Sequence, residues 1–362
     1  MNAYKRKTKA RSHHAILSTA FALLVGGATS GSYALVLSGS VNSGAGTYSV
    51  SDLQNNFAPV TETIGGITYV GVSLWTFLGG EPNLQHPSCP TCNTNPNQFL
   101  RNYLVATGAG GGTSLVSIGE IDPNFGGTGQ PYLIAYQRNG ALLGTPTLIV
   151  PQDPTGMRSV VDLAGISVGF VPAAGGPGGV TTQFSLTGVA NPATYDRAAL
   201  VALPATTIPS VTFMAGGGTT TLTNVVGAEP WTLLSLAGIA DSEVLRSYLV
   251  AMGSDGYQVL FSLGELDPDL GGRLTLVAYD VNGAPLGSTG FARIVIGGTP
   301  GDLRGGRFVS NISSLQVAAI PEPVTATMLA TGLLALSFYR RRRALAYAVR
   351  ALSDRHPGPE SA

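Results

Sequence analysis

An internal duplication limits what this chain can fold into. Leu100–Ala106 recurs as Leu245–Ala251, and at the same offset of about 145 positions Ser117–Pro123 recurs as Ser262–Pro268. The matches keep their order along the chain, and similarity at a fixed period marks repeated structural units. The sequence therefore predicts two modules that are built alike.

The modules are expected over residues 35–170 and 183–318. A further match, Arg158–Val168 with Arg307–Val317, lies near the C-terminal end of each module. The connecting residues 171–182 are rich in glycine and proline, a composition that predicts a flexible or loosely packed linker.

Short β-rich runs dominate each module. In the second, Tyr248–Met252, Gln258–Leu263 and Leu274–Tyr279 are bounded by Gly, Asp and Asn, which is typical of strands. The dipeptides Asn139-Gly140 and Asn282-Gly283 stand where a tight hairpin needs residues with positive φ.

Helical spacing is confined to short segments. It predicts a helix over Pro230–Ala237, with a counterpart at Val72–Leu78 and a second short helix starting near Leu263. Trp75 and Trp231 fall on the apolar faces of these helices, which favours core positions over sugar-stacking platforms. The predicted fold class is a strand-dominated α+β module, present twice.

The charge distribution argues against a nucleic-acid partner. Residues 35–319 contain nine arginines, no lysine and 17 acidic residues, a net charge of about −8. Binding to phosphates needs clustered cations, and the remaining basic residues lie near the two ends of the chain.

The N-terminal residues 1–34 have the pattern of a secretory signal peptide. A basic stretch precedes the apolar run Ala15–Gly26, and small residues follow up to Ser32-Tyr33-Ala34. The apolar run is shorter than the roughly 20 residues that span a bilayer. We expect signal peptidase to cleave after Ala34 and the chain to be exported.

A second hydrophobic segment lies near the C-terminus. Val324–Tyr339 is apolar or small throughout, and Arg340, Arg341, Arg342 and Arg343 follow at once. Because flanking cations stay cytoplasmic, this segment predicts a transmembrane helix with a membrane stop at the arginines and a cytoplasmic tail at 344–362.

The motif Pro321, Glu322, Pro323 stands directly before this segment. The order of the motif, the short membrane segment and the arginine cluster over residues 319–343 closely resembles the PEP-CTERM sorting tail of exopolysaccharide-producing Gram-negative bacteria. The resemblance implies recognition by an exosortase-type membrane protease. It also implies a precursor held transiently in the inner membrane, then a place at the cell surface or in the extracellular matrix, with exopolysaccharide as a candidate partner.

The modules carry a second resemblance. A Gly-x-x-x-Trp helix at Gly227–Trp231, the run Tyr248–Pro268 and a following Arg-Gly-Gly-Arg-Phe-Val strand resemble the sulfite-oxidase-type molybdopterin-binding fold. In that family a cysteine thiolate ligates molybdenum shortly before the helix. The corresponding stretches here, 58–66 and 211–217, contain no cysteine, and Met214 cannot supply the charge of a thiolate. We therefore expect the fold without the redox centre and without a cofactor.

Cys89 and Cys92 lie in a Pro- and Asn-rich insertion that the second module lacks. In an exported chain, a local disulfide is the favoured interpretation. A redox-active pair, and a metal site completed by His86, remain alternatives. His86 is the only histidine between the N-terminal signal peptide and the C-terminal sorting segment. The sequence therefore offers little support for a catalytic mechanism based on histidine.

The repeated charged residues are expected to be structural. The acids that stand before Pro and Gly-Gly are Glu120, Asp122, Glu265, Asp267 and Asp269. Their positions favour roles as caps and in turns over calcium binding or paired catalytic carboxylates. Arg101 and Arg246 recur at equivalent positions, where a scaffold ion pair is favoured over a clamp for an anionic ligand.

Two functional hypotheses follow. The first is an exported, non-catalytic protein of the exopolysaccharide or cell-surface layer that uses degenerate modules for binding or structure. The alternative is a periplasmic molybdopterin-dependent oxidoreductase or an accessory subunit of one. The missing metal cysteine and the shortage of histidine favour the first.

Overall fold

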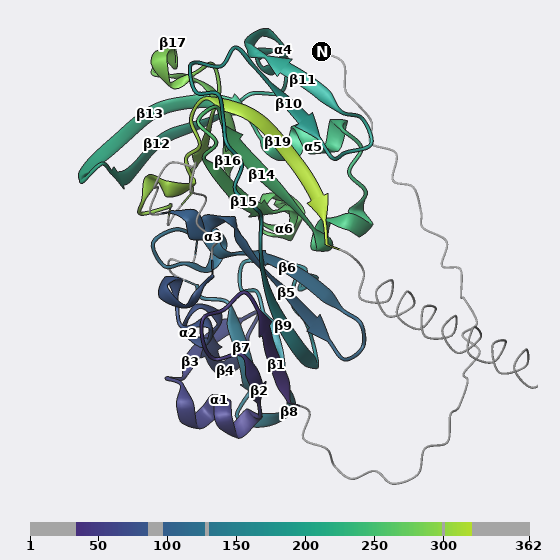
Figure 1. The fold of residues 1–362 in the computed structure, drawn as a ribbon. Helices are drawn as coiled ribbons and strands as arrows, with labels where there is room; N and C mark the ends of the chain where they lie inside the picture. The colour runs from purple at the N-terminus through teal and green to yellow at the C-terminus, as the bar shows by residue number, and fades with distance from the viewer. Residues whose placement is uncertain (1–33, 86–96, 127–129, 299–300, 321–362) are drawn as a thin grey trace, which may run out of the picture. The chain divides into compact units, whose positions relative to one another are not determined.

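Two five-stranded sheets of the same topology repeat along the chain (Figure 1). The computed structural model describes residues 34–85, 97–126, 130–298 and 301–320. The first sheet has the order β2 (Gly46–Tyr48), β1 (Leu35–Gly39), β9 (Leu163–Phe170), β5 (Asn102–Gly108) and β6 (Thr113–Ser117). The second has the order β11 (Ala193–Asp196), β10 (Gln183–Thr187), β19 (Ile312–Ala319), β14 (Ser247–Gly253) and β15 (Gln258–Ser262).

The pairing directions also repeat. In each sheet the first strand of the module runs parallel to its last strand, β1 with β9 and β10 with β19, while the other neighbours are antiparallel. Residues 35–170, called module 1 below, and residues 183–318, called module 2, thus contain equivalent sheets.

A second pair of sheets completes the modules. One has the order β3 (Val60–Ile64), β4 (Ile67–Ser73), β7 (Leu133–Arg138) and β8 (Ala141–Ile149). The other has the order β12 (Thr206–Ala215), β13 (Gly218–Ala228), β16 (Thr275–Val281) and β17 (Ala284–Pro285), and β18 (Arg293–Ile296) also pairs with β16. Two short strands, β17 and β18, therefore take the place of the single strand β8.

Helices are short and connect the strands. Those of module 1 are α1 (Val50–Asn56), α2 (Leu74–Leu78), η1 (Glu81–Asn83), η2 (Gln98–Arg101) and α3 (Ile118–Ile121). Those of module 2 are α4 (Arg197–Val201), α5 (Pro230–Leu236), η3 (Asp241–Arg246), α6 (Leu263–Leu266), η4 (Pro268–Leu270), η5 (Gly287–Thr289) and η6 (Gly305–Arg307). A strand-dominated α+β fold is confirmed.

The predicted helices and hairpins are present. Helix α5 begins at the predicted proline, whereas α2 begins two residues later than expected because Val72 and Ser73 still pair with β7. Asn139 and Asn282 have φ of 48° and 55°, and the glycine after each also has positive φ. Both dipeptides therefore adopt the turn that their residue types favour.

Most buried apolar residues of both modules form one continuous cluster, apart from a small second cluster of Leu133, Ala135 and Ile149. The larger cluster extends from Leu35 in β1 to Val317 in β19, and Trp75 and Trp231 pack against it, half-buried. Strand β5 alternates buried and half-buried residues from Asn102 to Gly108, whereas every residue of β15 is buried.

The linker makes contacts that its composition does not predict. Residues 171–182 are anchored to module 2, since the amide of Gly178 donates to the carbonyl of Ser254 at 2.7 Å and Ser254 Oγ donates to the carbonyl of Gly179 at 2.6 Å. A Cβ at Gly176 would lie 2.1 Å from the Ser254 carbonyl oxygen. Glycine, which was expected to loosen this segment, instead allows two backbones to come close.

Several sequence predictions fall outside the described residues. These are the signal peptide up to residue 33, the loop with Cys89 and Cys92, the motif Pro321–Pro323, and the membrane segment with its arginines and the tail that follows. Strand β1 begins at Leu35, next to the expected cleavage point. In the four described ranges no helix is long and apolar enough to span a membrane.

The close approach of β13 to β16 yields a stability prediction. A Cβ at Gly227 would lie 2.5 Å from the carbonyl oxygen of Val277, so Gly227→Ala should force the strands apart and cost about 1–3 kcal/mol. Gly218→Ala, at the other end of β13 with open space around it, is the matched control. Urea unfolding of both variants measures the difference, and equal midpoints would contradict the prediction.

Candidate functional site

Two helix starts place the acidic side chains of the candidate site. Strand β6 ends at Ser117, whose hydroxyl accepts the amide of Glu120, while Glu120 Oε1 accepts the amide of Ser117 at 2.6 Å. Strand β15 ends in the same way at Ser262, and Glu265 Oε1 accepts its amide at 3.0 Å. These reciprocal capping boxes hold each glutamate at the end of a strand.

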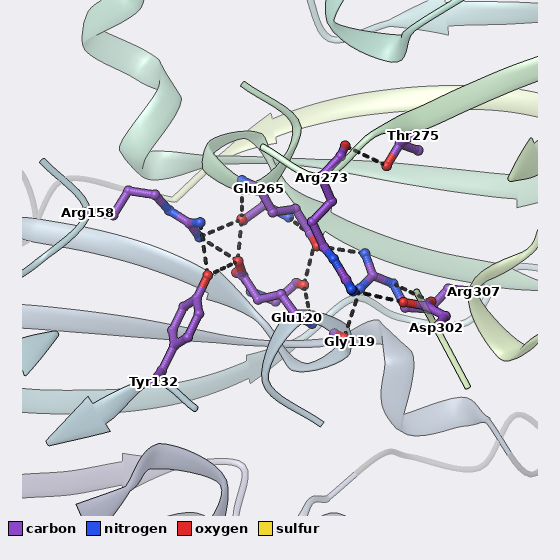
Figure 2. Close-up of polar contacts among 11 residues, drawn as sticks. Gly119, Glu120, Tyr132, Arg158, Glu265, Arg273, Thr275, Asp302 and Arg307 are labelled. Carbon is purple, nitrogen blue, oxygen red and sulfur yellow. Dashed lines mark hydrogen bonds and ion pairs between the residues drawn. The ribbon is translucent and has the colours of Figure 1, made fainter. Parts of the chain in front are cut away.

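Each glutamate forms a buried ion pair with the arginine of its own module. Arg158 Nη2 lies 2.5 Å from Glu120 Oε2, and Arg307 Nη2 lies 2.6 Å from Glu265 Oε2 (Figure 2). The four side chains are at most 3% exposed. Because Arg158 and Arg307 begin the matching segments of the two repeats, the ion pair is itself repeated.

Further bonds connect the two modules. Ser117 Oγ donates to Glu265 Oε1 at 2.7 Å, and Ser262 Oγ donates to Glu120 Oε1 at 3.0 Å. Arg307 Nη1 also donates to the carbonyl of Gly119 at 2.8 Å. Each module thus completes the polar environment of the glutamate in the other.

The two halves of the site are not identical. In module 1, Tyr132 donates to Glu120 Oε2 at 2.7 Å and accepts from Arg158 Nη1 at 2.9 Å. The strand register places Thr275 at the equivalent position of module 2. In module 2, Asp302 accepts from Arg273 at 2.9 Å and has its Oδ2 3.7 Å from Arg307 Nε, whereas the equivalent Asp153 accepts the backbone amide of Arg158.

Burial governs the electrostatics of this cluster. It raises the pKa of Glu265, and the neighbouring charge of Glu120 raises it further, against the opposing effect of Arg307. Burial likewise raises the pKa of Asp302 and raises that of Tyr132 well above its ordinary range. Tyr132 is therefore a neutral hydrogen-bond donor at ordinary pH.

A cavity of about 570 Å³ lies beside the cluster. Glu120, Tyr132 and Arg158 line it from module 1, and Glu265 and Arg273 from module 2. A second cavity of about 620 Å³ is lined mainly by module 2, with Tyr257, Arg304 and Phe308 among its residues. The first cavity is the one that adjoins the ion pairs.

The structure confirms caps and turns as roles of four of the five repeated acids. Besides the two glutamates, Asp122 accepts the amide of Asn124 at 2.8 Å and Asp267 accepts the amide of Asp269 at 2.9 Å. Across the described residues no group of three or more His, Cys, Asp or Glu side chains is arranged to hold a metal.

The arginines of these two buried pairs are Arg158 and Arg307, and not the repeated Arg101 and Arg246. Arg101 and Arg246 end the short helices η2 and η3, and Arg101 Nη1 donates to the carbonyl of Val171 at 2.6 Å. Sequence reasoning missed Arg158 and Arg307 as partners of the glutamates. The signal was available, because both arginines recur in the repeat.

The donor set does not fit molybdenum held by a thiolate. The stretch 58–66 ends in the turn of the β3–β4 hairpin, and the stretch 211–217 ends in the turn of the β12–β13 hairpin. Neither stretch carries a cysteine. Met214, in the second stretch, is 56% exposed and has only a neutral thioether. Both cysteines of the chain fall between residues 86 and 96, outside the described residues.

Comparisons with known proteins assign no family. No protein-family model matches the sequence, and no curated protein matches it. Among solved structures, the chain is similar to the sulfane dehydrogenase SoxCD from Paracoccus pantotrophus, with 20% identity and a TM-score of 0.32. The match covers 50% of this chain and 46% of that one, so this chain spans less than half of its neighbour's length. A likeness at this level carries neither an activity nor a cofactor to this chain.

Loss of one arginine should expose the cost of an unpaired buried charge. Arg307→Met leaves the Glu265 carboxylate without its cation in a site that is 2% exposed, so we expect a loss of about 3–5 kcal/mol in the free energy of unfolding. Arg197→Met removes a pair with Asp280 whose arginine is 42% exposed, and should cost about 1 kcal/mol or less. Denaturant unfolding of both variants tests the ranking, and a similar cost for the two would refute it.

Proposed function

We propose that this chain is an exported, non-catalytic protein of the cell-surface layer, in which two degenerate modules form one structural unit. The observation that carries the proposal is that both oxygens of each central carboxylate accept hydrogen bonds from the protein. Glu120 Oε1 accepts from Ser117 and Ser262, and its Oε2 accepts from Tyr132 and Arg158.

The carboxylate of Glu265 is engaged in the same manner. Its Oε1 accepts from the amide of Ser262 and the hydroxyl of Ser117, and its Oε2 accepts from Arg307. A general acid or base must reach a proton on a substrate within hydrogen-bond distance. Carboxylates whose oxygens already hold the two modules together are suited to a structural role instead.

Export and sorting rest on the sequence. The proposed signal peptide ends at Ala34, and the tail combines Pro321–Pro323, an apolar segment and four arginines. The described residues 34–320, with the gaps given above, lie between these two signals. We therefore propose that the paired modules are the part delivered to the surface, with the exosortase-type protease as a transient partner.

Elemental analysis tests the alternative of a molybdenum enzyme. Protein purified from the native host should contain far less than one molybdenum per chain, because the described residues supply no thiolate to hold it. Stoichiometric molybdenum that survives gel filtration would overturn the proposal and favour a molybdopterin-dependent oxidoreductase. A structurally characterised molybdoenzyme prepared in parallel serves as the positive control.

A substitution in the sorting motif tests the location. Replacing Pro321, Glu322 and Pro323 by alanine should retain the chain in the inner-membrane fraction, while the unfolding midpoint of the modules stays unchanged. The control Pro357→Ala/Pro359→Ala alters another Pro-x-Pro sequence, beyond the arginines, and should leave the location as it is. Cell fractionation reads out both variants, and an unaltered distribution of the first would reject sorting through this motif.

A further inference from the structure

We propose that each module carries a self-complementary docking surface, so that modules from two copies of this chain can pair as modules 1 and 2 pair within one. The surface of module 1 consists of Tyr103, Ser117, Gly119, Glu120 and Arg158. The surface of module 2 consists of their equivalents Tyr248, Ser262, Gly264, Glu265 and Arg307. The proposal depends neither on export nor on the absence of catalysis.

The serine–glutamate contacts between the modules are reciprocal. The hydroxyl of Ser117 reaches Glu265, and the hydroxyl of the equivalent Ser262 reaches Glu120, at 2.7 and 3.0 Å. In an isologous interface, when residue i contacts residue j of the partner, residue j contacts residue i in return. The serine and glutamate contacts follow that rule although the two modules belong to one chain.

Close packing at two glycines is reciprocal as well. A Cβ at Gly119 would lie 2.9 Å from Cδ of Arg307, and a Cβ at Gly264 would lie 2.7 Å from Nε of Arg158. Each module therefore leaves room on its own glycine for the arginine of the other. Because every module has both the arginine and the glycine, it fits a copy of itself.

Equivalent tyrosines meet at the centre of this arrangement. The rings of Tyr103 and Tyr248 stack with centroids 5.2 Å apart and an interplanar angle of 23°. A residue contacts its own equivalent only near a two-fold axis. Strands β6 and β15, which lead to the two capping boxes, are also in contact. The modules thus form a pseudo-symmetric dimer in which neither surface contains a group that the other lacks.

Blocking one surface of the full chain should leave the other free to pair with its own copy. In Gly119→Leu the new side chain occupies the place of Arg307, so module 2 loses its partner in the same chain while its own surface stays intact. We expect a dimer formed through two copies of module 2, seen as a doubled mass in size-exclusion chromatography with light scattering. The matched control Gly110→Leu, with open space around it, should keep the mass of the unmodified chain.

Cross-linking identifies the surface that pairs. In a Cys89→Ser/Cys92→Ser background with Gly119→Leu, Tyr248→Cys should be joined into covalent dimers by a short bis-maleimide, whereas Tyr103→Cys should not. A monomeric Gly119→Leu chain that keeps its unfolding transition overturns the proposal. Dimers that are cross-linked through neither position also overturn it.

A second measurement decides the question if Gly119→Leu does not fold. The chain with Tyr248→Cys in the same cysteine-free background, but with Gly119 intact, is refolded over a range of protein concentrations and then cross-linked. A yield of covalent dimer through position 248 that rises with concentration supports pairing between copies of module 2. Covalent dimer absent at every concentration refutes it.

Discussion

The two buried Arg–Glu pairs impose the strictest condition on this fold. Charges that are at most 3% exposed have lost their hydration and must be matched by opposite charges and hydrogen bonds. Here the match is complete only when the modules are docked, because Ser117 donates a hydrogen bond to Glu265 and Ser262 donates one to Glu120. The ends of β6 and β15, the capping boxes and the glycines that admit the arginines therefore have to come together at once.

Such pairs fix an arrangement more than they add stability. The desolvation of a buried ion pair offsets much of its attraction, and the continuous apolar cluster supplies the main driving force for folding. A sliding of one module against the other would keep much of that apolar burial but would separate Ser262 from Glu120 and Arg307 from Gly119. The charged cluster thus selects one docking geometry from the many that the apolar surfaces allow.

The features that the sequence predicted correctly are those that depend on residues close together in the chain. Strands, hairpins and short helices follow from patterns a few residues long, and Ser117 and Glu120 stand at capping-box spacing. The pairing of Glu120 with Arg158 joins residues 38 positions apart, so no local pattern contains it. The linker is a second example of a contact that no local pattern contains. Taken alone, Gly176 indicates a flexible backbone, but in the fold it lets the backbone pack closely against Ser254.

The differences between the modules lie around the docking surface rather than within it. Tyr132 is replaced by Thr275, the single strand β8 by β17 and β18, and the Arg273–Asp302 pair is added only to module 2. A residue on the docking surface of one module contacts the docking surface of the other module. A change at that residue therefore disturbs the packing of both modules. A residue at the periphery has one environment and can change alone. Tyr132 and Arg273 both line the cavity beside the ion pairs, so two of these differences change the lining of that cavity.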